Sequence, residues 1–512
     1  MFFVPSNPAE IAYIDKEDGE LVLKIYRPSS TLHGITNEPR ETVISGMGQL
    51  LAAHPGMSAD NLFVDSEQEL LVYAFSTRVF DDEGYPESYT SAECGFASLS
   101  GQRIDFESHH PLTAYSTITA CITFLLEPSE FCFEVQVLGD LVVWRAGEDH
   151  GGADGLADIL VYNWKTGVNV WVSMHALLAE NTPAEQIASY IINAPLRVQH
   201  SHAFDYAGRV RVELLSPSRL VIIDSNDFTM RLYQFDSERS TDCPLSWDSY
   251  DCLCVLKLPE WHKRAPSFLF VGMAESFLAH LPDLHAPETQ QATFLPDPAL
   301  ATLVLRISFT YAEFEYRSWY PETVWKEERD ERYLVFIPLT TLMRFPERSK
   351  LAQEKPPTIP WDDWGPLGTR VIRVEPHWYQ PLSVVGAYTA ELSRCIFDGR
   401  NATRDCILSV YEVHPFAAFV PPSHWQYKNA ETGEREAGTV TASSGGPFER
   451  LFTPDEDWIH DSTAWKAPIH TTYPIRKTTR VIPSMTEDGK YLRGMRMMHG
   501  KLILFRSELD DT

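Results

Sequence analysis

The segment Asp140–Val172 contains the most complete example of a unit that recurs along the chain. Its three apolar runs, Leu141–Trp144, Ile159–Tyr162 and Val168–Val172, alternate with a Gly/Asp-rich loop and with the turn Lys165–Gly167. β-branched and aromatic side chains suit a pleated, half-buried surface, and glycine lets the chain reverse direction between strands. The segment therefore predicts three successive strands of one antiparallel sheet.

Weaker copies share one pattern, which is a strand, an acidic turn, and a second strand ending in tyrosine. They are Ile11–Asp15 with Leu21–Tyr26, Leu62–Asp65 with Leu70–Tyr73, Leu220–Asp224 with Met230–Tyr233, and Cys395–Asp398 with Cys406–Tyr411. The copies are unevenly spaced, but further strand-like runs occupy the gaps, namely Tyr115–Leu126, Phe131–Val137, Leu303–Phe309 and Tyr333–Pro338. Units of several tens of residues made of strands and turns are typical of a β-propeller rather than of a sandwich.

The length of the chain agrees with a repeat architecture. Its 512 residues exceed the roughly 250–300 residues that one hydrophobic core usually supports. We expect an all-β fold, with residues 1–512 forming a single β-propeller domain that has long inter-blade loops. Seven blades are favoured, with six or eight as alternatives. Strands near Phe2–Val4 and Leu502–Phe505 are expected to close the ring, because closure removes exposed sheet edges.

Helical and loop signals are few. Thr182, Pro183 and Glu185 form a capping box with proline at the first helical position, which predicts a short helix near 183–191. The stretch 432–447 is rich in Gly, Ser, Glu and Thr, and we expect it to be a mobile loop.

Charge and cysteine content limit the partners and the compartment. The net charge of −28 repels phosphate backbones, so nucleic acid is not expected as a partner. Cysteines at positions 94, 121, 132, 243, 252, 254, 395 and 406, several of them inside apolar runs, suggest reduced, buried thiols. We find no secretory leader and no apolar run of membrane-spanning length, which predicts a cytoplasmic or nuclear protein that does not bind membranes.

Several side-chain groups could hold a metal ion in principle. They are His200 and His202 with Asp205, Cys252 and Cys254 with His262, and the pairs His109/His110 and His280/His285. None has the spacing that fixes three or four ligands, so core or surface roles are favoured over a metal site. We therefore assign no metal, cofactor or catalytic residue.

Familiar catalytic motifs are also missing from the sequence. We find no nucleophile elbow, phosphate loop or H-E-x-x-H pattern. Asp15, Asp65, Asp224 and Asp398 recur at matching hairpin positions. Because an aspartate in a turn can accept hydrogen bonds from nearby backbone N–H groups, we interpret them as part of the architecture.

The proline- and tryptophan-rich run Ile359–Arg370 attracts attention because tryptophan anchors many protein interfaces. The alternative is that Trp361 and Trp364 pack a long inter-blade loop onto the propeller. We favour packing, since Pro360 and Pro366 already restrict that loop.

The same run resembles a phrase found in mushroom-forming fungal F-box proteins, in which Pro-Trp-x-x-Trp-Gly-Pro-x-x-Thr-Arg precedes a strand. The hairpin Asp224–Tyr233 and the C-terminal pair Tyr473–Arg476 and Lys501–Phe505 are also similar to that family. The resemblance implies that this chain corresponds to the propeller-like, substrate-receptor region of such proteins. No F-box is recognisable in Met1–Gly46, so we do not expect these 512 residues to bind a Skp-type adaptor by themselves.

Two functional hypotheses follow. The favoured one is a non-enzymatic protein-binding module that holds a protein partner of unknown identity with loops on one propeller face. The alternative is a propeller hydrolase or lactonase with a metal or an acidic site in its central channel. Bound metal, or a funnel lined with inward-facing Asp, Asn and His, would favour the enzyme.

Overall fold

The computed structural model describes the regular elements and the turns that connect many of them. The described residues are 2–4, 6, 10–17, 19–27, 40–54, 57, 61–80, 86–99, 103–113, 117–124, 131–148, 158–172, 210–224, 228–235, 252–261, 264–265, 268–277, 301–315, 324–345, 356–374, 382–394, 405–413, 448–452, 459, 464–483, 491–498 and 501–507. Several sequence predictions lie outside these residues: the helix near 183–191, the loop 432–447, the strand Cys395–Asp398, and His200, His202, Asp205, His262, His280 and His285.

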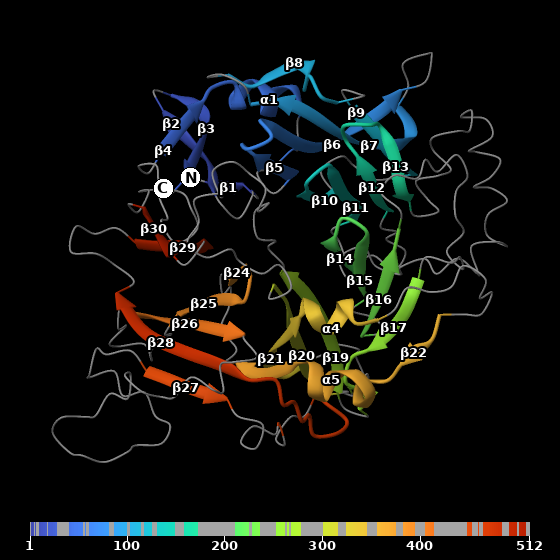
Figure 1. Ribbon diagram of the computed structural model, residues 1–512, viewed down its shortest axis with the longest axis vertical. Helices are drawn as coiled ribbons and strands as arrows, with labels where there is room; N and C mark the ends of the chain where they lie inside the picture. The colour runs from blue at the N-terminus through green and yellow to red at the C-terminus, as the bar shows by residue number, and fades with distance from the viewer. Residues whose placement is uncertain are drawn as a thin grey trace. The chain divides into compact units, whose positions relative to one another are not determined.

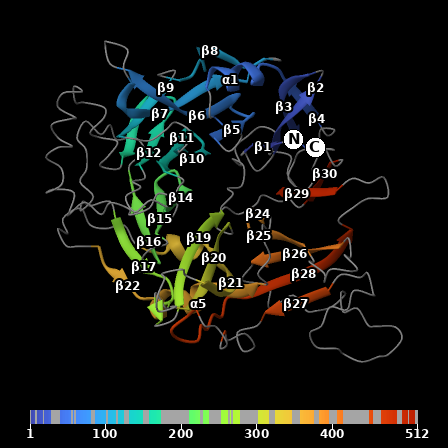
Figure 2. The same cartoon turned by 180° about the vertical axis from the view of Figure 1, so that it is seen from behind.

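The chain divides into two compact units. The first comprises Met1–Leu256, Pro282–Leu295 and Pro346–Thr358, and the second comprises Lys257–Leu281, Pro296–Phe345 and Ile359–Thr512. In both units the described strands form small sheets, in which neighbouring strands such as β1 and β2, or β20 and β21, are antiparallel (Figures 1 and 2). The expectation of a mostly-β chain is therefore confirmed.

Four sheets belong to the first unit. They are β1 (Phe2–Val4), β2 (Ile11–Glu17), β3 (Glu20–Arg27) and β4 (Arg40–Ile44); β5 (Leu62–Asp65), β6 (Leu70–Phe80), β7 (Pro86–Ser98), β8 (Asp105–His109) and β9 (Thr117–Phe124); β10 (Phe131–Leu138), β11 (Leu141–Glu148), β12 (Asp158–Asn163) and β13 (Val168–Val172); and β14 (Val210–Ser216), β15 (Arg219–Asp224), β16 (Thr229–Gln234) and β17 (Cys252–Lys257) with β22 (Thr358–Ile359). Helix α1 (Met47–Ala53) follows the first sheet.

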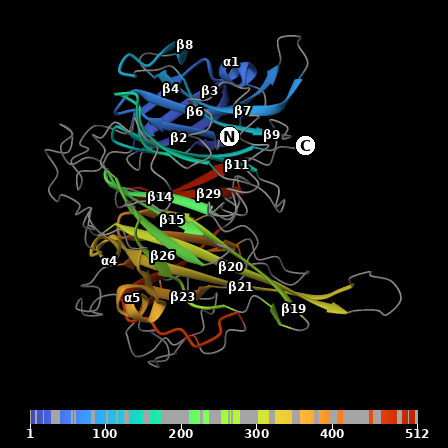
Figure 3. The ribbon, with the colours of Figure 1, turned by 90° about the vertical axis from the view of Figure 1, so that its right-hand side faces the viewer.

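Three sheets belong to the second unit. They are β18 (Arg264–Ala265), β19 (Phe268–Phe277), β20 (Thr302–Glu315), β21 (Val324–Pro338) and β23 (Arg370–Val374); β24 (Leu382–Val385), β25 (Tyr388–Arg394), β26 (Asp405–Val413), β28 (Ile475–Pro483) and β27 (Phe448–Phe452); and β29 (Tyr491–Met498) with β30 (Lys501–Ser507). Helices α4 (Leu339–Met343) and α5 (Trp361–Gly368) flank the first of these sheets, whose long β20–β21 hairpin is clear in Figure 3. No helix in the described ranges is both long and apolar enough to cross a membrane.

Turn chemistry explains two of the hairpins. Asp65 accepts hydrogen bonds from the backbone N–H groups of Glu67 (3.1 Å) and Gln68 (3.2 Å). Asn163 does the same four residues before Gly167, accepting from the N–H groups of residues 165 and 166. In each turn the fourth residue after the Asx residue has a positive φ, 53° at Glu69 and 77° at Gly167. The interpretation of Asp65 as a turn residue is confirmed.

Asp15 has a different role from Asp65. It lies inside β2 and forms an ion pair with Lys24 of β3 at 3.3 Å. Asp224 is a buried residue at the end of β15, and Asp398 lies outside the described residues. The described aspartates are therefore not equivalent, because Asp15 pairs with the neighbouring strand while Asp65 accepts hydrogen bonds from its own turn.

The central strands bury both of their faces. On β6, Leu71, Tyr73 and Phe75 join the core shared with the first sheet, while Leu70 and Val72 join the core shared with β10–β12. Side chains alternate across a strand, so one strand serves two cores. The first strands of successive sheets also lie next to one another: β1 contacts β5, β5 contacts β10, and β10 contacts β14. Consecutive propeller blades are arranged in this way.

The second unit is built on the same plan. Val304, Phe336 and Tyr411 belong to a core between the sheets that contain β20 and β26. A further core joins the other face of the β26 sheet to β29 and β30, through Leu408 and Met495. Sheets packed face to face in series are thus common to both units.

The helices differ from the sequence predictions, and the closure of the ring is not tested by the described strands. The run after Pro360 is helix α5 and not a loop, and α1 and α4 were not predicted. Among the described strands, β1 pairs with β2 and β30 pairs with β29. Closure of the ring, the number of blades and the single-domain organisation therefore stay predictions.

Candidate interaction site on the tryptophan-rich helix

Helix α5 has one buried and one exposed face. Trp361, Trp364, Gly365 and Gly368 are buried, and their spacing of three and four residues places them on one side of the helix. Asp362, Asp363 and Leu367 are exposed on the other side. The first turn therefore carries two carboxylates, which the positive end of the helix dipole favours.

The buried face is closely fitted. The rings of Trp361 and Trp364 meet edge to face, with centroids 5.1 Å apart and planes at 80°. Gly365 lies against the Trp361 ring so closely that an added Cβ would come within 2.4 Å of it. A methyl group has no room there. The preference for packing over recognition at these two tryptophans agrees with this geometry.

Hydrogen bonds fix both ends of the buried face. The indole N–H of Trp364 donates to the carbonyl oxygen of Lys257 at 2.9 Å. The Thr341 hydroxyl donates to the Gly368 carbonyl oxygen at 2.8 Å, which joins α4 to α5. The Thr369 hydroxyl caps the carbonyl of Gly365 at 2.7 Å. Two of the carbonyl groups that the last helical turn leaves without a helical partner are thereby satisfied.

A distant segment is also fastened to the helix. The backbone N–H of Thr472 donates to the Pro366 carbonyl oxygen at 2.8 Å, and the N–H of Tyr473 donates to that of Thr369 at 3.3 Å. The buried guanidinium of Arg370 donates to the Thr471 carbonyl oxygen at 3.0 Å. Helix α5 is thus held from three parts of the sequence.

The exposed face carries an unusual apolar group. Leu367 is 78% exposed, the largest value among the large apolar side chains that the structure describes. It follows Pro366 and precedes Gly368. Gly368 packs closely against Thr341, since a Cβ added to this glycine would lie 2.6 Å from the Thr341 side chain. A leucine that points into solvent from a rigidly held helix, beside two carboxylates, forms the ridge that we call the α5 ridge: Asp362, Asp363 and Leu367.

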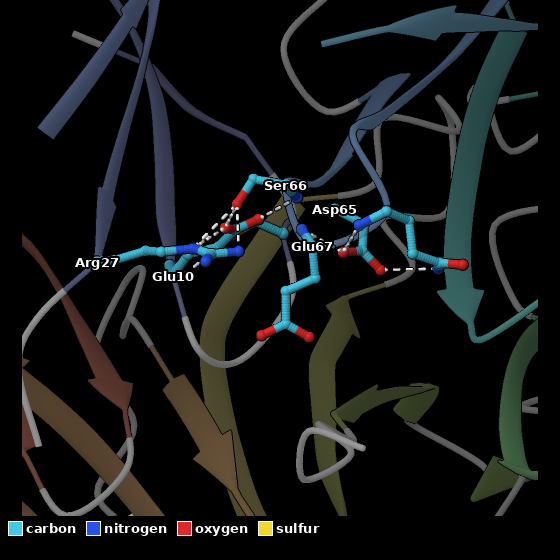
Figure 4. Close-up of polar contacts among 7 residues, drawn as sticks. Glu10, Arg27, Asp65, Ser66 and Glu67 are labelled. Carbon is cyan, nitrogen blue, oxygen red and sulfur yellow. Dashed lines mark hydrogen bonds and ion pairs between the residues drawn. The ribbon is translucent and has the colours of Figure 1, made fainter. Parts of the chain in front are cut away.

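A second polar cluster lies in the first unit. Glu10 precedes β2 and is 1% exposed, and its carboxylate accepts hydrogen bonds from the Ser66 hydroxyl and from the Ser66 N–H at 3.0 Å (Figure 4). Arg27, at the end of β3, forms an ion pair with Glu10 at 3.3 Å. Arg27 also donates to the Ser66 hydroxyl oxygen, from Nη2 at 2.8 Å and from Nε at 3.1 Å.

This cluster connects the first two sheets of the first unit. Burial raises the pKa of Glu10, while Ser66 and Arg27 act in the opposite direction. Sequence analysis missed the cluster because its members are far apart in the chain and match no motif. An acidic residue directly before an apolar strand, as Glu10 is before Ile11, was the one local signal.

Three of the histidine and cysteine candidates, Cys252, Cys254 and His110, are described with their side chains, and all three are buried. Cys252 and Cys254 are buried, and burial raises the pKa of Cys254 to about 12. His110 accepts a hydrogen bond from the N–H of Leu112 at 3.2 Å, and its ring meets Trp164 edge on at 5.1 Å. Within the described part of the chain, no group of three or more His, Cys, Asp or Glu side chains could hold a metal ion.

Four of the predicted buried thiols are described with their side chains. Cys94, Cys252, Cys254 and Cys406 are all buried, as the sequence predicts.

Comparison with protein families and with curated proteins gives no match. Similar solved structures include the WD40 domain of SCAP from fission yeast, at 11% identity over 79% of this chain and 68% of that chain, with a TM-score of 0.28. Hsv2 from Kluyvelomyces marxianus is 7% identical over 81% of this chain and 92% of that chain, with a TM-score of 0.28. An endo-arabinase from Bacteroides thetaiotaomicron is 8% identical over 68% of this chain and 87% of that chain, with a TM-score of 0.22. TM-scores this low do not establish a shared fold, so the architecture rests on the sheet topology and packing described above.

Proposed function

We propose that this chain is a non-enzymatic protein-binding module, in which propeller-like blades form the scaffold and the α5 ridge docks the partner. The serial, face-to-face packing of sheets within each unit supports the propeller part of the proposal. The resemblance of the run Ile359–Arg370 to fungal F-box proteins makes a protein the expected ligand. The net charge of −28 agrees with a partner that is not a nucleic acid.

The exposure of Leu367 carries the proposal. Fully burying a leucine side chain contributes about 1.5–3 kcal/mol. Because Leu367 is 78% exposed, docking would gain about 1–2 kcal/mol from this one side chain, or roughly 5–30-fold in affinity. A helix that is already held in place loses little conformational freedom on binding, which preserves that gain.

Quantitative affinity purification tests the proposal. The tagged full chain, Leu367→Asp and a matched control, Leu112→Asp, are used as baits in extracts of the cells that produce the protein. Leu112 is also an exposed leucine, at 57%, but it lies in the first unit. We expect a partner that the parent and Leu112→Asp retain and that Leu367→Asp loses.

A purified pair then gives the decisive number. We expect Leu367→Ala to weaken the affinity by roughly 5–30-fold, as calculated from the exposed fraction of Leu367. Equal partner sets for all three baits, or equal affinities for the parent and Leu367→Ala, would refute docking through the α5 ridge.

A further inference from the structure

The turn that follows β5 places a serine between acidic residues. Its sequence is Asp65-Ser66-Glu67-Gln68-Glu69, and the side chains of Glu67 and Glu69 are exposed. Ser66 itself is partly exposed. Protein kinases select substrates partly by charge, and a substrate groove lined with basic side chains favours a serine flanked by carboxylates.

The surroundings of Ser66 already suit a phosphate group. Arg27 directs two N–H groups at the one hydroxyl oxygen, Nη2 at 2.8 Å and Nε at 3.1 Å (Figure 4). A guanidinium presents its donors in a fork that matches phosphate oxygens. A phosphate on Ser66 would therefore meet a positive group that is in place before modification.

From this juxtaposition we propose that Ser66 is a phosphorylation site for an ATP-dependent protein kinase that prefers acidic substrates, and that its phosphate takes Arg27 from Glu10. In the reaction the Ser66 oxygen forms a bond to the γ-phosphorus of ATP. The bond between that phosphorus and the bridging oxygen breaks, ADP leaves, and the hydroxyl proton passes to the kinase's base. The proposal does not depend on the binding role of the α5 ridge.

The modification changes the contact between the first two sheets of the first unit. The hydroxyl that donates to Glu10 is lost, and a phosphate charge of about −1.5 to −2 appears beside the buried carboxylate. Like charges this close are unfavourable, so Glu10 binds a proton or turns away from Ser66. The ion pair between Arg27 and Glu10, now 3.3 Å, is replaced by one between Arg27 and the phosphate.

Phosphopeptide mapping of the folded full chain tests the site. The protein is incubated with ATP and a purified acid-directed serine/threonine kinase. Ser218 is the internal control, because it also lies in a hairpin turn, between β14 and β15, but is flanked by Pro217 and Arg219. We expect roughly tenfold more phosphate on Ser66 than on Ser218, and a fall of similar size at Ser66 in the double variant Glu67→Gln/Glu69→Gln.

A phosphorus NMR titration tests the role of Arg27. The second pKa of phosphoserine is about 6, and the guanidinium should hold it lower in the phosphorylated parent than in Arg27→Gln. Should Arg27→Gln fail to fold, Arg27→Lys removes the fork while keeping the charge. A Ser66 that is modified no faster than Ser218, or that is modified equally without the two glutamates, would overturn the proposed site. An unchanged titration midpoint would overturn the capture of Arg27.

Discussion

Truncating Trp364 to alanine should destabilise the second unit strongly. The ring is 1% exposed, and its N–H donates to the Lys257 carbonyl oxygen. Removing a buried tryptophan side chain costs about 3–5 kcal/mol through lost burial and the cavity left behind. The hydrogen bond to the partly buried Lys257 carbonyl contributes only about 0.5–1.5 kcal/mol, so most of the loss comes from the ring. We therefore expect a loss of about 3–5 kcal/mol.

The loss converts into a measurable shift in melting temperature. For a unit of this size, 1 kcal/mol shifts the midpoint by about 2–4 °C. Trp364→Ala should thus melt about 6–20 °C below the parent in scanning calorimetry. Trp361→Ala should behave similarly, because Trp361 is 9% exposed and shares the edge-to-face contact.

Leu367→Ala is the matched control on the same helix. It removes an exposed side chain, so the free energy of unfolding should change by less than about 0.5 kcal/mol. A Trp364→Ala midpoint within about 1 °C of the parent, with the control also unchanged, would show that the ring does not support the fold.

Three further predictions concern single residues. Gly365→Ala should lower the free energy of unfolding by about 1–3 kcal/mol, because its Cβ would meet the Trp361 ring at 2.4 Å. Glu69→Gly should raise it by about 0.5–1 kcal/mol, since Glu69 is exposed and has a φ of 53° that glycine adopts without strain. Glu10→Gln should change the pH dependence of stability. Burial raises the pKa of Glu10 above its ordinary value of 4.5, so the folded state binds this proton more tightly. The stability that the proton contributes is fully present below pH 4.5 and is lost as the pH rises through the raised value. The parent should therefore lose stability relative to Glu10→Gln over that window.

Gly365→Ala has a matched control, and the other two predictions each have an outcome that would contradict them. Gly48→Ala, in α1, adds a Cβ with nothing closer than 3.8 Å and should stabilise by about 1 kcal/mol in urea titrations. A destabilised Glu69→Gly would contradict the strain argument. A difference in the free energy of unfolding between the parent and Glu10→Gln that stays constant from pH 4 to about 8, whatever its size, would show that Glu10 does not bind its proton more tightly in the folded state.

The hairpins were predictable because their signals are local. Leu62–Asp65 with Leu70–Tyr73 became β5 and β6, and Leu220–Asp224 with Met230–Tyr233 became β15 and β16. The two apolar runs of each hairpin lie within a few residues of each other, and in the first hairpin the Asx turn of Asp65 joins them. The three strands expected in Asp140–Val172 are β11 to β13, as predicted.

Helix α5 was missed for the opposite reason. Pro360 and Pro366 within seven residues predict a loop when only local preferences are considered. The helix forms because Trp361, Trp364 and Gly365 fit a tertiary surface that includes Lys257 and Thr341. Nothing in the run Ile359–Arg370 indicates those distant partners. The cluster of Glu10, Arg27 and Ser66 was invisible in the sequence for the same physical reason.

The two-faced strands restrict how this chain can change over evolutionary time. Polar and apolar residues do not alternate in the middle of β6, so side-chain size decides which face of the strand each residue occupies. Tyr73 and Phe75 lie on one face, and Val72 and Ala74 lie on the other. Deleting one residue would send the two rings into space shaped for the two small side chains and would spoil both cores at once. Substitutions of similar volume can accumulate freely in such a strand. Insertions and deletions can persist only in the loops, so homologues should keep the lengths of their central strands long after they have lost recognisable sequence identity.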